Sequence, residues 1–225
     1  MTIDIALREI RNRSARFPEL ASSHHFTFDR HLPDNTTIPE LAVVGINPGL
    51  STAEINTRRE DRPLVCHEES SQHDFRRGSI PHNTKQWFRN IRDFCGTQSV
   101  TTTEFFFWSS RNAGNDFTHR FGSKLGKSKH LPFCRDMNQV LIKHYPIKLI
   151  VSPGLGSIKF ARRLYGMEPV DCIRCPETNH RLVERFRCDG RTWLFTKHWT
   201  GARGFSNAQR NIVREQIQQA LRDSS

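Results

Sequence analysis

The chain has 225 residues, enough for a single domain with a sizeable core, and no break in composition divides it. The formal net charge of +11 and the isoelectric point of about 9.9 favour a polyanionic partner, nucleic acid first and an acidic membrane surface second. No stretch is long and apolar enough to span a membrane, and the first residues lack the apolar core of a signal peptide. We therefore expect an intracellular protein, cytoplasmic and associated with the nucleoid, whose cysteines are reduced thiols.

The first 39 residues are predicted to form an N-terminal helix and a linker, at 4–17 and 32–39. An α/β core is predicted at 40–222, where four short apolar runs have the length of strands: 41–46, 104–108, 147–151 and 192–196. Helical spacing of apolar residues lies between and after these runs, at 84–94, 134–145, 155–166 and from Ser206 onward. The alternation indicates a three-layer α/β/α sandwich around a short four-stranded parallel sheet.

The loops that follow the predicted strands carry polar side chains suited to one site. The first strand ends at the segment 45–49, GINPG, which contains Asn47, and the last is followed by His198, Thr200 and Arg203. The carboxyl ends of parallel strands meet at one edge of a sheet, where ligands bind. An amide, a hydroxyl, an imidazole and a guanidinium, without paired carboxylates or a thiol nucleophile, suit binding a flat heterocycle and orienting a water molecule.

Two short motifs resemble a known family. The segment 45–50, GINPGL, resembles the first motif of the uracil-DNA glycosylase superfamily and is closest to the branch of mismatch-specific thymine/uracil-DNA glycosylases. The segment 198–205 is similar to the second motif, with Trp199 in the place of the usual Pro. His82-Asn83, followed by Trp87 and Phe88, resembles the segment that packs over the base pocket. The resemblance covers roughly residues 40–222 and implies a uracil-DNA-glycosylase-like fold.

The resemblance also implies an activity. It predicts a monofunctional DNA glycosylase that hydrolyses the N-glycosidic bond of a flipped pyrimidine and leaves an abasic site. Asn47 would orient the attacking water, and His198 would hydrogen-bond the base oxygen as negative charge develops there. The implied partner is DNA, as a duplex with a flipped base or as a single strand. We expect a monomer that needs no metal or diffusible cofactor and acts in DNA repair or in defence against phage.

The contacts with the substrate follow from the same motifs and loops. The residues expected to bind the base are Gly45, Ile46, Pro48, Ser109, Asn112, Trp87, Phe88 and Trp108. The residues expected to bind DNA are Thr200, Arg203, Phe205, Arg111, Lys124 and Lys127, with Arg203 as the first candidate and Phe205 as the next for the wedge that fills the gap left by the base. The segment 110–130 is glycine-rich and basic, as a DNA-contacting loop should be.

The identity of the base is less defined. The family commonly has an Asn at the end of the second strand to read the uracil edge, and the nearest position here is Ser109, with Asn112 three residues on. We therefore expect uracil, a mismatched thymine or a modified cytosine, including a bulky hypermodified base of the kind that phage DNA carries.

Two other functions and one other site remain open. A non-catalytic module that recognises a flipped or single-stranded base would use the same pocket, with Asn47 purely structural. A nucleotide-binding enzyme could use Gly154-Leu155-Gly156, although this loop has no third glycine and no matching acid. Cys172, Cys175 and Cys188 could hold a metal, but without a second compact pair they are more simply ordinary thiols.

Overall fold

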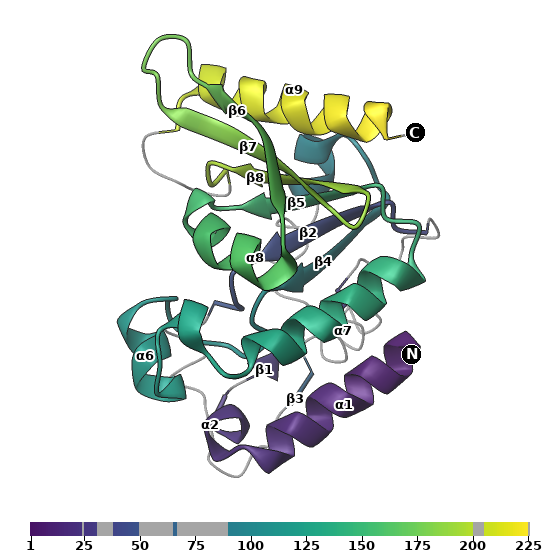
Figure 1. Ribbon diagram of the computed structural model, residues 1–225, viewed down its shortest axis with the longest axis vertical. Helices are drawn as coiled ribbons and strands as arrows, with labels where there is room; N and C mark the ends of the chain where they lie inside the picture. Colours follow the sequence, from purple (N-terminus) through teal and green to yellow (C-terminus); the bar gives the residue numbers. More distant parts are fainter. Residues whose placement is uncertain (24, 31–37, 50–64, 67–89, 200–204, 225) are drawn as a thin grey trace.

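The computed structural model describes residues 1–23, 25–30, 38–49, 65–66, 90–199 and 205–224. It shows one sheet of six strands with helices on both of its faces (Figure 1). The strands lie in the order β4 (Val100–Glu104), β2 (Leu41–Gly45), β5 (Leu149–Pro153), β8 (Arg191–Thr196), β7 (Arg181–Cys188) and β6 (Glu168–Arg174). The first four strands are parallel to one another, and β7 and β6 are added antiparallel. Two further strands, β1 (His25–Phe26) and β3 (Val65–Cys66), form a separate parallel pair.

The predicted α/β class is confirmed, but the sheet is mixed and has six strands instead of four parallel ones. The two extra strands, β6 and β7, were not predicted because both are rich in charged residues. The side chains of β6 are almost all exposed, so no apolar run marks this edge strand. In β7 only Leu182, Val183, Phe186 and Cys188 are buried, and charged residues separate these positions.

The second parallel strand also differs from the prediction. It runs over Val100–Glu104 and ends where a strand over 104–108 was expected to begin. The threonines at 101–103 are β-branched and suit a pleated strand. The aromatic run 105–108 that suggested a strand is fully buried but irregular, and it fills the core beneath the sheet edge.

Helices occur close to the predicted 4–17, 134–145, 155–166 and from Ser206 onward, whereas those at Pro18–Ala21 and Asn115–Phe121 were not predicted. The helices are α1 (Ile3–Arg16), α2 (Pro18–Ala21), α6 (Asn115–Phe121), α7 (Leu131–His144), α8 (Ile158–Tyr165) and α9 (Asn207–Asp223), with short 3₁₀ turns η1 (Leu125–Lys127) and η2 (Leu155–Ser157). Residues 90–95 are helical and form the described end of the helix expected at 84–94. Ser206 caps α9 as predicted, since its Oγ accepts a hydrogen bond from the backbone N–H of Gln209 at 3.2 Å.

The segment 110–130 was expected to be a loop, yet it contains α6 and η1. Phe117 and Phe121 anchor α6, because both rings are buried against Phe106 with centroid distances of 4.7 Å. Two aromatic residues four positions apart share one helical face, and this pattern outweighs the local glycine content.

Apolar residues fill both sides of the sheet. One cluster lies under α1, α7 and α8 and includes Ala6, Ile10 and the aromatic run 105–108. The other lies under α9 and the helical turn 90–95 and includes Val43, Val151 and Val213. Strands β2 and β5 are buried on both faces, which explains their continuous apolar sequences. Across the part of the chain described here, no helix combines the length and the apolar character that crossing a membrane requires.

Candidate functional site

Asn47 lies just beyond the end of β2, and its side chain is held from two directions. Its Nδ2 donates a hydrogen bond to Ser110 Oγ at 2.7 Å and another to the carbonyl of Pro48 at 3.2 Å. Because a carbonyl can only accept, it fixes the amide nitrogen on this side and the amide oxygen on the other. Among the described residues, none donates a hydrogen bond to Oδ1 of the half-buried Asn47. The oxygen is therefore available as an acceptor for a water molecule.

Ser110 makes this orientation rigid. Its Oγ donates its own proton to the carbonyl of Asn112 at 2.8 Å, so it must accept from Asn47. The backbone N–H of Ser110 also bonds the carbonyl of Pro48 at 3.1 Å, and Gly49 forms a parallel bridge with Ser110. Asn47 is thus positioned by the segments that follow both β2 and β4. Sequence reasoning selected the neighbouring Ser109, and no local signal distinguishes the two serines.

Glu104 at the end of β4 is a second residue that the sequence analysis missed. It pairs with Gly45 in the parallel register, and a Cβ on Gly45 would lie 2.1 Å from Glu104 Oε2. Any side chain at position 45 would therefore displace this carboxyl. The Oε2 atom is buried and has no hydrogen-bond partner among the described residues. Burial raises the pKa of Glu104 to about 8, against the opposing effect of the nearby Arg30 charge, so the carboxyl is largely neutral at pH 7.

Helix α7 holds the end of β4 in place through hydrogen bonds from Asn138. Asn138 of α7 donates from Nδ2 to the carbonyl of Glu104 at 2.9 Å, and its Oδ1 accepts from Thr103 Oγ1 at 2.8 Å. This buried amide is therefore bonded on both sides to the last two residues of the strand. The backbone that carries the Glu104 side chain is consequently fixed by α7.

His198 follows β8, and one strand, β5, separates β8 from β2. The side chains of His198 and Asn47 therefore leave the same end of the sheet. His198 is exposed, yet partial desolvation lowers its pKa, so the imidazole is neutral at pH 7 and can donate one hydrogen bond. Trp199, in the place of the family's proline, is buried and stacks on Phe94 at a centroid distance of 4.5 Å. Its Nε1 donates to Thr196 Oγ1 at 3.0 Å, which ties the start of this loop to the core.

Several residues expected to bind the base have structural partners. Trp108 is fully buried, and its indole Nε1 donates to Ser14 Oγ of α1 at 2.8 Å, so the ring belongs to the core. The side chain of Asn112 accepts from the backbone N–H of Gly114 at 3.0 Å and shapes the turn before α6. Ile46 and Pro48 support the Asn47 loop through packing and backbone hydrogen bonds. Trp87 and Phe88 lie outside the described residues.

The residues expected to contact DNA are only partly described. Arg111, Lys124 and Lys127 are exposed on and around α6 and η1. Phe205 is partly buried against the core beneath α9, and the Lys197 ammonium lies 5.3 Å from the centre of its ring. This packing argues against Phe205 as the wedge. Thr200 and Arg203 lie outside the described part of the chain.

The three cysteines considered as metal ligands do not converge. Cys172 is exposed on β6, whereas Cys175 and Cys188 are buried in the clusters on opposite faces of the sheet. The thiol of Cys188 donates to the carbonyl of Tyr165 at 3.2 Å. Within the described ranges, no group of three or more His, Cys, Asp or Glu residues could hold a metal ion.

Compared with models of protein families and with curated proteins, the sequence matches none of them. The two motifs and the arrangement around Asn47 are therefore the features that point to a function.

Proposed function

We propose that the protein is a DNA glycosylase that excises a flipped pyrimidine by hydrolysis, with Asn47 positioning the water. The single observation that carries this proposal is the orientation of the Asn47 amide. Its nitrogen is bound to Ser110 and Pro48, which leaves the oxygen as a fixed acceptor at the carboxyl end of the sheet. A positioned acceptor of this kind orients a water molecule without deprotonating it.

The proposed reaction needs stabilisation of charge more than strong acid or base chemistry. As the glycosidic bond breaks, positive charge develops on the sugar and negative charge on the departing base. A neutral His198, whose pKa is lowered by desolvation, donates a hydrogen bond to a base oxygen. The water held by Asn47 then attacks C1′, its proton passes to solvent, and an abasic sugar remains in the uncut strand.

Glu104 supports a pyrimidine as the substrate. A neutral carboxyl offers one donor and one acceptor, and the edge of a pyrimidine at N3 and position 4 also presents one of each. Glu104 lies beside Gly45, two residues before Asn47, and its Oε2 lacks a described partner. In this proposal the base edge supplies that partner. Both 4-oxo and 4-amino pyrimidines complement a carboxyl that can turn over, which keeps thymine, uracil and modified cytosine as candidates.

The direct test is release of the base from labelled DNA, detected by alkaline cleavage at the abasic site. The panel contains U:G, U:A and T:G duplexes, single-stranded uracil, and 5-substituted cytosines including glucosylated ones. We expect cleavage at one class of base by the wild type and none by Asn47→Ala. An Asn115→Ala variant is the matched control, because it removes an exposed amide from the start of α6 that takes no part in the bonds around Asn47.

The alternative non-catalytic module predicts a different outcome. It would bind one base class tightly and release none, and Asn47→Ala would leave that binding intact. These two results together would refute the glycosylase and support the binding module.

A further inference from the structure

A basic pocket lies beside the Asn47 end of the sheet, between α8 and β7. Its volume is about 570 Å³, and four cationic side chains line it together with a single acid: Lys159, Arg162, Arg163, Arg181 and Glu184. Arg181 is paired with Glu184. Within the described residues, the other three cations form no ion pair. Most of the positive charge in this α8 pocket is therefore not neutralised.

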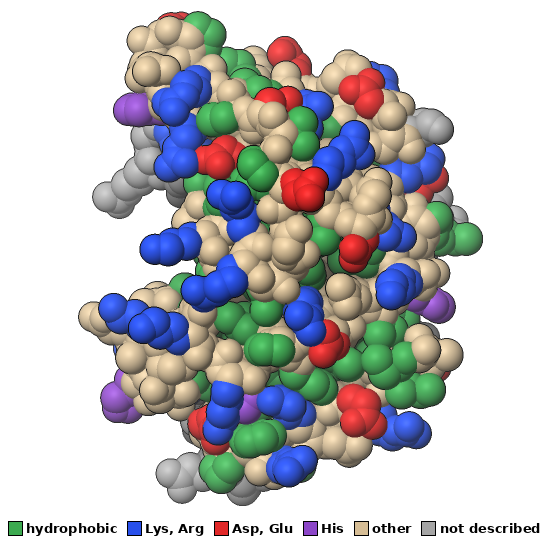
Figure 2. All heavy atoms as spheres, viewed as in Figure 1, with side chains coloured by type: hydrophobic (Ala, Val, Ile, Leu, Met, Phe, Trp, Pro, Cys, Tyr) green, Lys and Arg blue, Asp and Glu red, His purple; other side chains and the backbone are tan. Residues whose placement is uncertain are grey.

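The α8 pocket is continuous with the lysines of η1. Arg163 Nη2 donates to the carbonyl of Gly126 at 2.7 Å, and a Cβ on Gly126 would lie 3.1 Å from Phe160 Cβ. Lys124 and Lys127 flank Gly126 and are exposed. We call the combined set the α8–η1 surface, and it consists of Lys124, Lys127, Lys159, Arg162, Arg163 and Arg181. Figure 2 shows Lys and Arg side chains gathered over this side of the molecule.

The α8–η1 surface begins next to the proposed catalytic loop. Leu155 and Gly156, which line the pocket, follow the carboxyl end of β5, the strand adjacent to β2. A Cβ on Gly154 would lie only 3.7 Å from Ile46 Cδ1, so the two loops are in contact. A polymer whose base reached Asn47 would pass close to this surface.

We propose that the α8–η1 surface binds the phosphate backbone of DNA on one side of the flipped nucleotide, an inference that rests on the proposed function. Lys159 and Arg163 are four residues apart on α8, which is about 6 Å along the helix axis. One strand of duplex DNA carries a phosphate about every 3.4 Å along the axis, so this distance covers two to three phosphates. Three cations without an ion pair among the described residues, spread along one helix, match that spacing better than they match a single compact anion. The exposed large apolar side chains among the described residues are Met1, Ile38 and Val170, all outside this surface, so nothing here favours insertion into a membrane.

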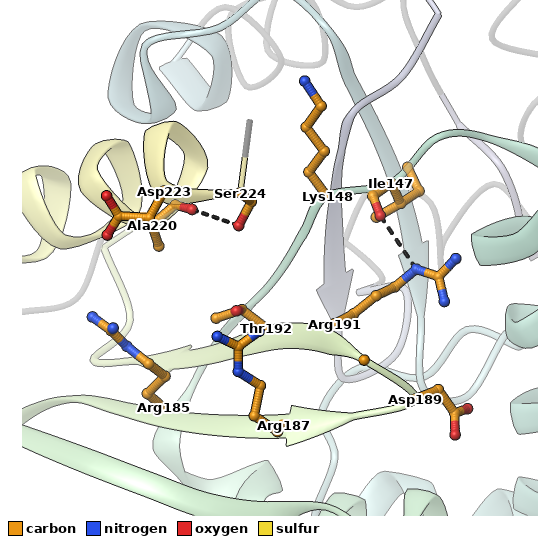
Figure 3. Close-up of a pocket in the computed structure, with 11 residues that line it drawn as sticks. Ile147, Lys148, Arg185, Arg187, Asp189, Arg191, Thr192, Ala220, Asp223 and Ser224 are labelled. Atoms are coloured by element: carbon orange, nitrogen blue, oxygen red, sulfur yellow. Dashed lines mark hydrogen bonds between the residues drawn. The ribbon is translucent and has the colours of Figure 1, made fainter.

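A second basic pocket provides an internal control. This hairpin pocket has a volume of about 490 Å³ and lies at the amino ends of β5 and β8, near the end of α9 (Figure 3). Its four cations, Lys148, Arg185, Arg187 and Arg191, share the lining with two acids, Asp189 and Asp223. Two of the cations also have carboxylate neighbours outside the lining: Lys148 pairs with Glu40 at 3.2 Å, and Arg185 Nε lies 3.6 Å from Asp171. The carboxyl end of a helix carries partial negative charge, which disfavours phosphate there.

The test compares the salt dependence of DNA binding between two triple variants of the full chain. Lys159→Gln/Arg162→Gln/Arg163→Gln removes three charges from the α8 pocket, and Lys148→Gln/Arg187→Gln/Arg191→Gln removes three from the hairpin pocket. The probe is a short labelled duplex without damaged or modified bases, so binding is read independently of excision. Each lost phosphate contact lowers the slope of log K against log salt by about 0.9 for duplex DNA.

We expect the slope of the α8 variant to decrease by about 2–3, with at least a tenfold loss of affinity at low salt. The hairpin variant should keep nearly the wild-type slope. A charge-preserving variant, Lys159→Arg/Arg162→Lys/Arg163→Lys, should restore the slope, which separates charge from folding. An unchanged slope in the α8 variant, or equal losses of slope in both triple variants, would refute DNA binding by the α8–η1 surface. If the wild type showed no salt-dependent binding, DNA would not be its partner, and the proposed function would be refuted as well.

Discussion

The polar groups at the two ends of the central sheet differ in how many of them have hydrogen-bond or ion-pair partners. At the carboxyl ends of β2 and β4, Asn47 Oδ1 and Glu104 Oε2 lack donors among the described residues, although the rest of each side chain or its backbone is firmly held. At the amino ends, Lys148 of the hairpin pocket pairs with Glu40 and Arg191 donates to the carbonyl of Ile147, although the buried Arg185 Nε lacks a hydrogen-bond partner among the described residues. A buried polar atom without a partner costs stability, so one that is rigidly held at a sheet end is a candidate for contact with a ligand. The two acceptors at the ends of β2 and β4 therefore favour the carboxyl end for the proposed site.

The largest expected effect comes from Asn47→Ala. This change removes the oriented acceptor and the bond to Ser110, and it should reduce base release by about 1,000-fold, comparable to the loss of one preorganised group in other active sites. Single-turnover rates on the substrate identified from the panel would measure it. A loss below about tenfold, with folding unchanged, would show that water is oriented by another group.

Gly45→Ala should disturb the same end of the sheet sterically. The new Cβ would lie 2.1 Å from Glu104 Oε2, so the buried carboxyl must move, at a cost of roughly 3 kcal/mol in the free energy of unfolding. Urea denaturation would measure this cost. The Gly45→Ala/Glu104→Ala double variant should recover part of it, because the clash is removed. Equal destabilisation with and without Glu104 would place the strain elsewhere.

Glu104→Gln should change how stability depends on pH. Because burial raises the pKa of Glu104 to about 8 from the ordinary value of 4.5, the folded state binds the proton more tightly than the unfolded state. The free energy of unfolding of the wild type should therefore fall as pH rises from about 4.5 to 8, by about 1.4 kcal/mol per pH unit. The Gln variant should lack this decline, so it should gain about 2–3 kcal/mol relative to wild type between pH 6 and pH 8. Parallel pH profiles of the two proteins in urea would argue that the carboxyl is already ionised.

Ser110→Ala should have a moderate effect on activity. Without its Oγ, the Asn47 amide keeps only the Pro48 carbonyl, so it becomes less well oriented while remaining present. We expect about a tenfold decrease in kcat with little change in KM, since Ser110 does not touch the substrate. The matched control is Ser109→Ala, one residue away. A larger effect of Ser109 than of Ser110 would transfer the positioning role to Ser109.

The smallest effect should come from the opposite end of the sheet. Lys148→Gln removes an exposed ion pair with Glu40, and we expect a change in the free energy of unfolding within about 0.5 kcal/mol and no change in base release. Thermal unfolding and the excision assay would measure both. A clear loss of excision would show that the amino end of the sheet also contributes to the activity.

The sequence predicted the α/β class and the bounds of individual elements where local signals were strong. Proline and glycine after an apolar run mark the end of β2, and the capping serine marks the start of α9, so Asn47 and Ser206 were placed correctly. Glu104 and Ser110 were missed because their importance depends on the register between β2 and β4, which no local pattern reveals. The aromatic run 105–108 misled the strand assignment, since burial alone does not distinguish a strand from an irregular core segment.

The two hydrogen bonds that hold the Asn47 amide bear on how related proteins could differ in the base they accept. The hydrogen bonds that orient the amide come from residues at 48 and 110, so the geometry of the water site is set by two strand ends that are adjacent in space and distant in sequence. The long stretch of chain between them contributes none of these bonds. In the proposed glycosylase, substitutions in that stretch outside β4 and the buried run 105–108 would therefore alter which base is admitted while the hydrogen bonds to the Asn47 amide stay constant. One hydrolytic centre could thus serve lineages that meet different modified DNAs.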